Sequence, residues 1–194
     1  PVLMLHRWAH HDSHNKLIWN RLKEFRQNGV IDELGASVYT PEEALSALSD
    51  PEVRHLQIPF NLLDNRWIAP EFQLAVDKRP EVTIHARSSY LQGVLLSCPD
   101  AWPIKEGFDA KVFCERLDTL VRDLGRQSRA DLCLAYLNSC SFVDSIVVGV
   151  ETIEQFQSNL ELFRQARLLA KEKSQVESSF MDVPAWLLNP SEWP

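Results

Sequence analysis

The sequence lacks long hydrophobic runs and clusters of positive charge. No apolar run approaches the roughly 20 residues that a membrane-spanning helix needs, and no signal-peptide pattern is visible. Lys and Arg number 20 against 27 Asp and Glu, a formal net charge of −7. These features argue against a membrane protein, an anionic-membrane surface and a nucleic-acid-binding surface.

Cysteine patterns typical of metal sites or redox motifs are also missing. Cys98, Cys114, Cys133 and Cys140 have no metal-ligand spacing and form no Cys-x-x-Cys pair. Cys114 and Cys133 lie within helix-like apolar patterns. We therefore expect buried, reduced thiols in a cytoplasmic protein.

Histidines are crowded near the N-terminus, where His6 is followed by His10, His11 and His14. Their number is suggestive of a metal cluster, but no carboxylate or cysteine stands at a convincing spacing from them. We expect no metal site, and we expect His10, His11 and His14 to lie on a solvated loop.

The composition is that of a globular protein, with 45% hydrophobic and 24% charged residues. Its 194 residues suffice for one sizeable domain or part of a larger one. The chain opens at Pro1, without an initiator methionine, and enters the apolar run Val2–Leu5 at once. We expect this run to be a strand buried on both faces, in a sequence that begins inside a domain.

Strand and helix patterns alternate along the chain. Thr40-Pro41-Glu42-Glu43 is a strong helix start, with a threonine cap, proline at the first position and acids in the first turn. The predicted strands are Val2–His6, Glu33–Ser37, His55–Pro59, Val82–Ala86 and Ser145–Gly149. The predicted helices are Asn15–Asn28, one from Thr40, Ala69–Lys78, Phe108–Leu124, Ser128–Ser139 and Thr152–Lys171. This order predicts parallel strands with helical crossovers, in either a doubly wound sheet or part of a (β/α)8 barrel.

Polar residues stand at the C-terminal ends of the predicted strands, where both architectures bind ligands. The residues at these ends are His6, Ser37, Gln57, Arg87, Ser88 and Gly149.

Five segments occur in an order that resembles the aldo-keto reductase family. They are "LMLHRW", "LGASVYTPEEA", "LQIPFNLLDNR", "HARSSYLQGVLL" and "VVGVETIEQFQSNL", which together span Leu3 to Leu160. The resemblance implies an α/β fold, the (β/α)8 TIM barrel. Residues 1–175 would be about the last five β/α units of one barrel, and residues 176–194 an irregular C-terminal tail.

The resemblance also implies roles for individual residues. His6 matches the histidine of the family's Asp, Tyr, Lys and His catalytic tetrad, whose other members precede the histidine in the chain. Ser37 and Gln57 match residues that hold the carboxamide of a nicotinamide cofactor, although Val38 stands where an asparagine is usual.

A second group of residues matches the part of the family site that holds the phosphates and adenosine. Ser88 matches the serine of a loop over the pyrophosphate, where Ser89 replaces the usual proline. The residues that match the adenosine end are Gly149, Glu151, Gln155 and Asn159. Glu151 would repel a 2′-phosphate but accept from a ribose hydroxyl, which favours NADH over NADPH.

The resemblance predicts an NAD(P)-dependent oxidoreductase that reduces an aldehyde, ketone or sugar-like substrate by hydride transfer, with no metal. The alternative is a non-catalytic nucleotide-binding barrel that acts as a sensor or partner subunit, because no tetrad Asp, Tyr or Lys precedes His6. A third possibility is a half-barrel with unpaired strand edges, which is expected to aggregate or dimerise.

Overall fold

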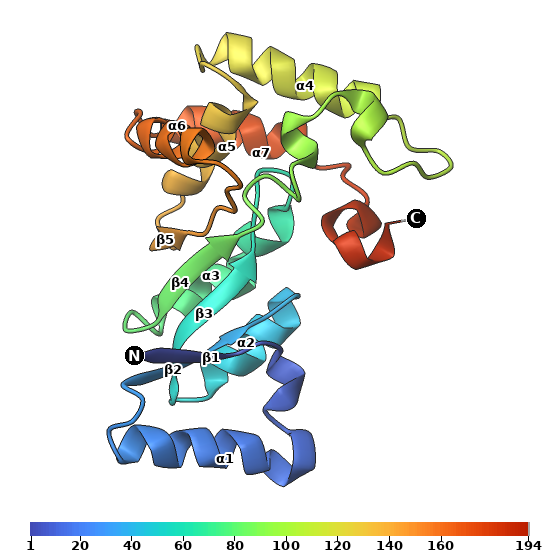
Figure 1. Cartoon of the computed structure of the whole chain (residues 1–194). Helices are drawn as coiled ribbons and strands as arrows, with labels where there is room; N and C mark the ends of the chain where they lie inside the picture. Colours follow the sequence, from blue (N-terminus) through green and yellow to red (C-terminus); the bar gives the residue numbers. More distant parts are fainter. Residues whose placement is uncertain (194) are drawn as a thin grey trace. The chain divides into compact units, whose positions relative to one another are not determined.

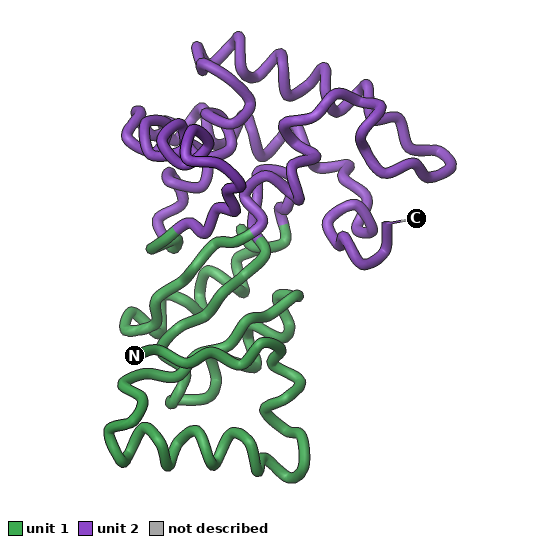
Figure 2. The backbone as a smooth tube through the Cα atoms, in the orientation of Figure 1, with its two compact units in different colours: residues 1–59, 66–87, 142–145 green, residues 60–65, 88–141, 146–194 purple. Residues whose placement is uncertain are grey.

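The computed structural model describes residues 1–193, which form two compact units. Unit 1 comprises residues 1–59, 66–87 and 142–145, and unit 2 comprises residues 60–65, 88–141 and 146–194. Figure 2 shows the two units in different colours, and the chain passes between them several times.

Parallel strands form the centre of unit 1. The sheet has the order β1-β2-β3-β4-β5, so that neighbours in sequence are neighbours in space. The strands are β1 (Val2–Leu5), β2 (Glu33–Ser37), β3 (Val53–Pro59), β4 (Thr83–Arg87) and β5 (Ser145–Ile146). The pairing of β1 with β2, β2 with β3 and β3 with β4 is parallel throughout. This confirms the prediction of parallel strands joined by crossovers.

Two of the strand predictions need correction. β1 is an edge strand on which Val2 and Leu3 are exposed, so it is not buried on both faces. The predicted strand at Ser145–Gly149 is only the two-residue β5, and Gly149 lies beyond its end. Apolar content alone predicts a strand but not whether a neighbour covers it.

Gly35 is required where β2 and β3 approach each other. A Cβ atom at this position would lie 2.4 Å from the carbonyl oxygen of His55 and 2.7 Å from its Cβ. Because part of the obstruction is backbone, it cannot rotate away. The close approach therefore depends on the missing side chain.

Helices connect these strands as the sequence indicates. They are α1 (Ser13–Gln27), α2 (Pro41–Ser49) and α3 (Pro70–Asp77), and Figure 1 shows them beside the strands of unit 1. Thr40 caps α2, since its Oγ1 accepts from the Glu43 N–H at 3.3 Å. The Glu43 carboxylate in turn accepts from the N–H of Tyr39, the residue before the cap, at 2.7 Å.

Unit 2 is mainly helical. Its helices are α4 (Ala110–Asp123), α5 (Arg129–Asn138), α6 (Ile153–Phe163) and α7 (Ala170–Ser179). The predicted single helix Thr152–Lys171 is wrong, because α6 ends at Phe163 and α7 begins at Ala170. The stretch expected to be irregular from Val176 instead begins inside α7, and Val176 is fully buried.

Short 3₁₀ helices lie between and after the longer helices and strands. The 3₁₀ helices are η1 (Trp8–His10), η2 (Asn65–Ile68), η3 (Val94–Leu96), η4 (Pro99–Ala101), η5 (Ala185–Leu188) and η6 (Pro190–Glu192). Within residues 1–193, none of the helices is long and apolar enough to cross a membrane.

Candidate functional site

Three of the predicted site residues lie at the C-terminal ends of neighbouring strands in unit 1. Ser37 pairs with Gln57 in the register of β2 and β3, and the Val38 N–H donates to the Gln57 carbonyl at 3.0 Å. His6 lies one residue beyond the paired Leu5 and Ala36. The structure thus brings Ser37 and Gln57 together and places exposed His6 at the end of the adjacent strand.

A chain of polar side chains crosses the same face of the sheet. His55 and Gln57 share a face of β3 because side chains alternate along a strand. The His55 and His85 rings stack, with Nδ1 of His55 2.9 Å from Nε2 of His85. The Glu33 carboxylate is hydrogen-bonded to Nε2 of His55. The Ser145 hydroxyl is hydrogen-bonded to Nδ1 of His85. Desolvation, with the charge of His55 in support, lowers the pKa of His85.

The Ser88 loop belongs to unit 2 and has unusual backbone geometry. Ser88, Leu91 and Gln92 have φ values of +62°, +46° and +56°, in the left-handed region that non-glycine residues rarely adopt. Ser89 is 2% exposed, and its hydroxyl lies 3.5 Å from the carbonyl of Val147. Such geometry concentrates at ligand-binding segments, which is consistent with the role the sequence suggests for this loop.

The remaining predicted residues surround the N-terminal end of α6 in unit 2. Thr152 caps the helix by accepting from the Gln155 N–H at 3.2 Å. The Gln155 side chain accepts from the Glu151 N–H at 2.8 Å. Asn159 accepts a 2.7 Å hydrogen bond from Tyr90, the phenol whose pKa is raised by burial. The structure therefore brings Glu151 close to Gln155 and ties Asn159 to the segment that follows Ser88.

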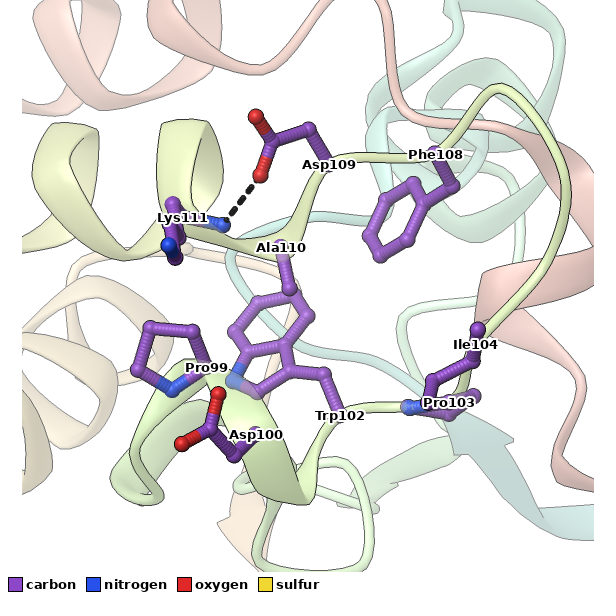
Figure 3. Close-up of a pocket in the computed structure, with 9 residues that line it drawn as sticks. All are labelled: Pro99, Asp100, Trp102, Pro103, Ile104, Phe108, Asp109, Ala110 and Lys111. Carbon is purple, nitrogen blue, oxygen red and sulfur yellow. Dashed lines mark hydrogen bonds between the residues drawn. The ribbon is translucent and has the colours of Figure 1, made fainter.

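Aromatic residues that follow strand ends have two different environments. Phe60 and Trp67 are completely buried and belong to the core. Trp102 lines a pocket of about 180 Å³ in unit 2, with Phe108 stacked on it at 6.2 Å (Figure 3). Its indole nitrogen is buried without a hydrogen-bond partner among the described residues. This pocket contains none of the predicted site residues.

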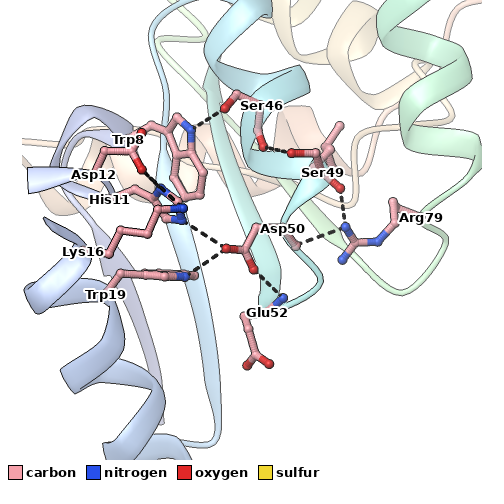
Figure 4. A network of polar contacts seen from close by, with 11 residues as sticks. Trp8, His11, Asp12, Lys16, Trp19, Ser46, Ser49, Asp50, Glu52 and Arg79 are labelled. Carbon is pink, nitrogen blue, oxygen red and sulfur yellow. Dashed lines mark hydrogen bonds and ion pairs between the residues drawn. The ribbon is translucent and has the colours of Figure 1, made fainter.

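The expectation of a solvated histidine loop is wrong for His11. Figure 4 shows this side chain within a polar network. His11 is 6% exposed, stacks on Trp8 at 4.2 Å and has both ring nitrogens near carboxylates, those of Asp12 and Asp50. Within residues 1–193 no group of His, Cys, Asp and Glu side chains is arranged to hold a metal ion.

The cysteines also differ in part from the prediction. All four are free, and Cys114, Cys133 and Cys140 are buried as expected, whereas Cys98 is exposed. Burial raises the pKa of the Cys133 thiol and, to about 12, that of Cys140, so both remain protonated thiols at neutral pH.

Sequence reasoning missed one cluster at the strand ends of unit 1. The guanidinium carbon of Arg87 lies 4.7 Å from the Tyr39 ring centroid, and that of Arg7 lies 5.9 Å from it. Arg87 also donates to the Val38 carbonyl at 3.2 Å. The available signal was that Arg7 and Tyr39 immediately follow the strand-end segments of His6 and Ser37.

The comparisons with solved structures agree with this geometry. Aldo-keto reductase AKR11C1 from Bacillus halodurans matches in its holo form with a TM-score of 0.75 at 20% identity, covering 92% of this chain and 58% of that one. The apo form of the same protein matches with a TM-score of 0.70 at 19% identity, covering 92% and 61%. The thermostable aldo-keto reductase Tm1743, in complex with the inhibitor epalrestat, gives 0.62 at 18%, covering 92% and 59%.

The chain thus spans about three fifths of the length of these structures. The likeness shows the fold: the strands and helices are the later units of a (β/α)8 barrel. No match was found among curated proteins. The family model described as "Aldo/keto reductase family" matches residues 2–179, and the chain belongs to this family.

Proposed function

We propose that the protein is an NAD(P)-dependent oxidoreductase that reduces the carbonyl of an aldehyde, ketone or sugar-like substrate, and that it acts in the cytoplasm. The observation that carries the proposal is the pairing of Ser37 with Gln57 at the ends of β2 and β3. A carboxamide needs a donor and an acceptor, and a hydroxyl beside a side-chain amide supplies both. Ser37 is 8% exposed, so its hydroxyl is largely withdrawn from water.

The donor set of each unit fits its part of the cofactor. In unit 1, Ser37 and Gln57 would hold the nicotinamide carboxamide. In unit 2, Ser88 would contact the pyrophosphate, and the capped start of α6 offers N–H groups and a positive helix end to phosphate charge. When bound, the nicotinamide supplies the hydride.

His6 is the residue of the described chain that we assign to catalysis. A histidine at the C-terminal end of a barrel strand is placed to hydrogen-bond a substrate carbonyl and orient it. The resemblance assigns the proton donor to a tyrosine that precedes this histidine, and residues 1–5 contain no tyrosine. Reduction by the mechanism of the family needs that group in addition to His6.

Glu151 supports a preference for NADH. It stands in the loop before α6, where we place the adenosine ribose, and its backbone is fixed by the bond to Gln155. A carboxylate there repels a 2′-phosphate and accepts from a 2′-hydroxyl.

The test is a fluorescence titration of the 194-residue protein with NADH and with NADPH. We expect NADH to bind more tightly, and Ser37→Ala to weaken NADH binding about ten-fold, the effect of losing about 1.4 kcal/mol. Ser174→Ala is the control, because Ser174 is an exposed serine of α7. Where turnover is measurable, the ratio of kcat/KM for the two cofactors tests the same preference. Tighter binding of NADPH contradicts the Glu151 argument, and no binding of either cofactor contradicts the proposal.

A second function is that of a nucleotide-binding sensor or partner subunit without catalysis, which would use the same cofactor-binding residues. It predicts the same titration without consumption of NADH when aldehydes, ketones and sugars are added. Oxidation of NADH that depends on the carbonyl compound and is lost in His6→Ala supports the enzyme.

A further inference from the structure

Four polar side chains of unit 1 form a continuous row of hydrogen bonds across the sheet. The row consists of Glu33 on β2, His55 on β3, His85 on β4 and Ser145 on β5. Nδ1 of His55 lies 2.9 Å from Nε2 of His85. The outer nitrogens of the two rings are hydrogen-bonded to the Glu33 carboxylate and the Ser145 hydroxyl. We call this row the Ser145 relay; it contains none of the residues assigned to the cofactor.

The carboxylate of Glu33 sets the direction of every bond in the Ser145 relay. An ionised carboxylate can only accept, so Nε2 of His55 carries the proton of the bond to Glu33. In a neutral imidazole the other nitrogen is an acceptor, so Nδ1 of His55 accepts from the Nε2–H of His85. Nδ1 of His85 is then an acceptor as well, and the Ser145 hydroxyl donates to it. The proton of Ser145 therefore points at a basic nitrogen.

His85 is placed to act as the base for this hydroxyl. Desolvation lowers its pKa, so the ring is uncharged at neutral pH and able to accept a proton. The imidazolium that forms is stabilised through His55 by the Glu33 carboxylate, and the charge of Asp144 acts in the same direction. A nucleophile, a base and an acid thus lie in one line, with a second imidazole between the base and the acid.

The two ends of the Ser145 relay are open to solvent. The side chain of Glu33 is 49% exposed, whereas that of His55 in the middle is 12% exposed. Ser145 is half-buried, and the exposed Val147 follows it two residues further along the chain. A small molecule can therefore reach the hydroxyl while the bond between the rings is shielded from water.

We propose that Ser145 is the nucleophile of a second catalytic site, at which the protein cleaves uncharged carboxylic esters. The Ser145 oxygen forms a bond to the ester carbonyl carbon while its proton passes to Nδ1 of His85. The ester C–O bond then breaks, and the alcohol leaves with that proton. Water attacks the acyl-serine with the same base, the carboxylic acid is released, and Ser145 regains its proton. The negative charges of Glu33 and Asp144 disfavour anionic esters.

This reaction needs no nicotinamide, so it stands or falls apart from the proposed reduction. The experiment treats the 194-residue protein with an alkyl fluorophosphonate, which phosphonylates a nucleophilic serine oxygen and releases fluoride. Mass spectrometry of the peptides identifies the serine. We expect one adduct, on Ser145, and labelling about a hundred-fold slower in His85→Gln, the contribution of a general base. Labelling of another serine, or of none, overturns the proposal.

Hydrolysis of 4-nitrophenyl acetate measures turnover. We expect a burst of nitrophenol from acylation of the serine, and its loss in Ser145→Ala. Ser13→Ala is the matched control, because Ser13 is also half-buried but donates to the Ala9 carbonyl at 3.2 Å instead of to a histidine. An unchanged burst in Ser145→Ala, or equal losses in the two variants, overturns the proposal. If Ser145→Ala does not fold, the adduct on the unmodified chain decides.

Glu33 is a positioning residue, since it acts on the base only through His55. Glu33→Ala removes the acceptor that fixes the tautomer of His55, and we expect it to slow labelling of Ser145 about ten-fold. Glu33→Gln restores an acceptor oxygen without the charge, and we expect it to recover part of the rate. A labelling rate that Glu33→Ala leaves unchanged overturns the relay through the two histidines.

Discussion

At the scale of single residues, protonation of His85 makes the stability of the folded chain depend on pH. Its pKa lies below the ordinary value of 6.5, through desolvation and the nearby His55, while Asp144 acts in the opposite direction. The unfolded chain therefore binds a proton near pH 6.5 that the folded chain does not yet bind. Stability is present above that pH and is lost as the pH falls through it.

The corresponding prediction concerns the free energy of unfolding measured by denaturant titration between pH 8 and pH 5. We expect it to decrease as the pH falls below about 6.5, and we expect His85→Asn to flatten this dependence. His14→Asn is the control, because His14 is exposed and its φ of +50° suits asparagine. An unchanged pH slope in His85→Asn contradicts the role given to this side chain.

At the scale of elements, Asp50 holds α1 and η1 against the end of α2. Its Oδ2 accepts from the Trp19 indole at 3.0 Å and lies 3.1 Å from His11 Nε2, while its Oδ1 accepts from the Glu52 N–H at 2.8 Å (Figure 4). Trp19 is 1% exposed, so its N–H has no water to turn to when the carboxylate is removed. One short side chain thus anchors a helix to the sheet that carries the candidate site.

Asp50→Ala is therefore expected to lower the free energy of unfolding by about 3 kcal/mol, because buried donors are left unpaired. Denaturant unfolding followed by tryptophan fluorescence measures this change. Asp77→Ala, which removes an exposed carboxylate at the end of α3, is expected to change stability by less than about 0.5 kcal/mol. Equal effects of the two substitutions count against the anchoring role.

At the scale of the whole molecule, cofactor binding and stability are linked. A ligand that binds only the folded chain at a hundred times its Kd stabilises it by about 2.7 kcal/mol. For a chain of this size that corresponds to a rise in Tm of about 5–10 °C. We expect NADH to produce such a rise in a thermal unfolding experiment and NADPH, at equal concentration, to produce a smaller one. A Tm that neither cofactor moves at millimolar concentration counts against cofactor binding.

The sequence by itself determined the features that depend on neighbours along the chain. The strand Glu33–Ser37 and the Thr40 cap of α2 are as predicted, because alternation, capping and proline placement act over a few residues. The parallel strands and the family could also be predicted from the sequence. Strand and helix patterns alternate along the chain, and the segments at the strand ends occur in the order of the family. The same reasoning placed Ser37 and Gln57 on adjacent strand ends, where the register pairs them.

Only the tertiary structure decided what depends on residues distant in sequence. His11 is buried because Asp50, 39 residues away, accepts from its ring. Arg7 and Arg87 meet over Tyr39 because three strands end at one edge of the sheet. The helix expected over Thr152–Lys171 is interrupted, and Val176 beyond it is buried in α7. In each case the free energy comes from packing and charge between elements, which local pattern does not encode.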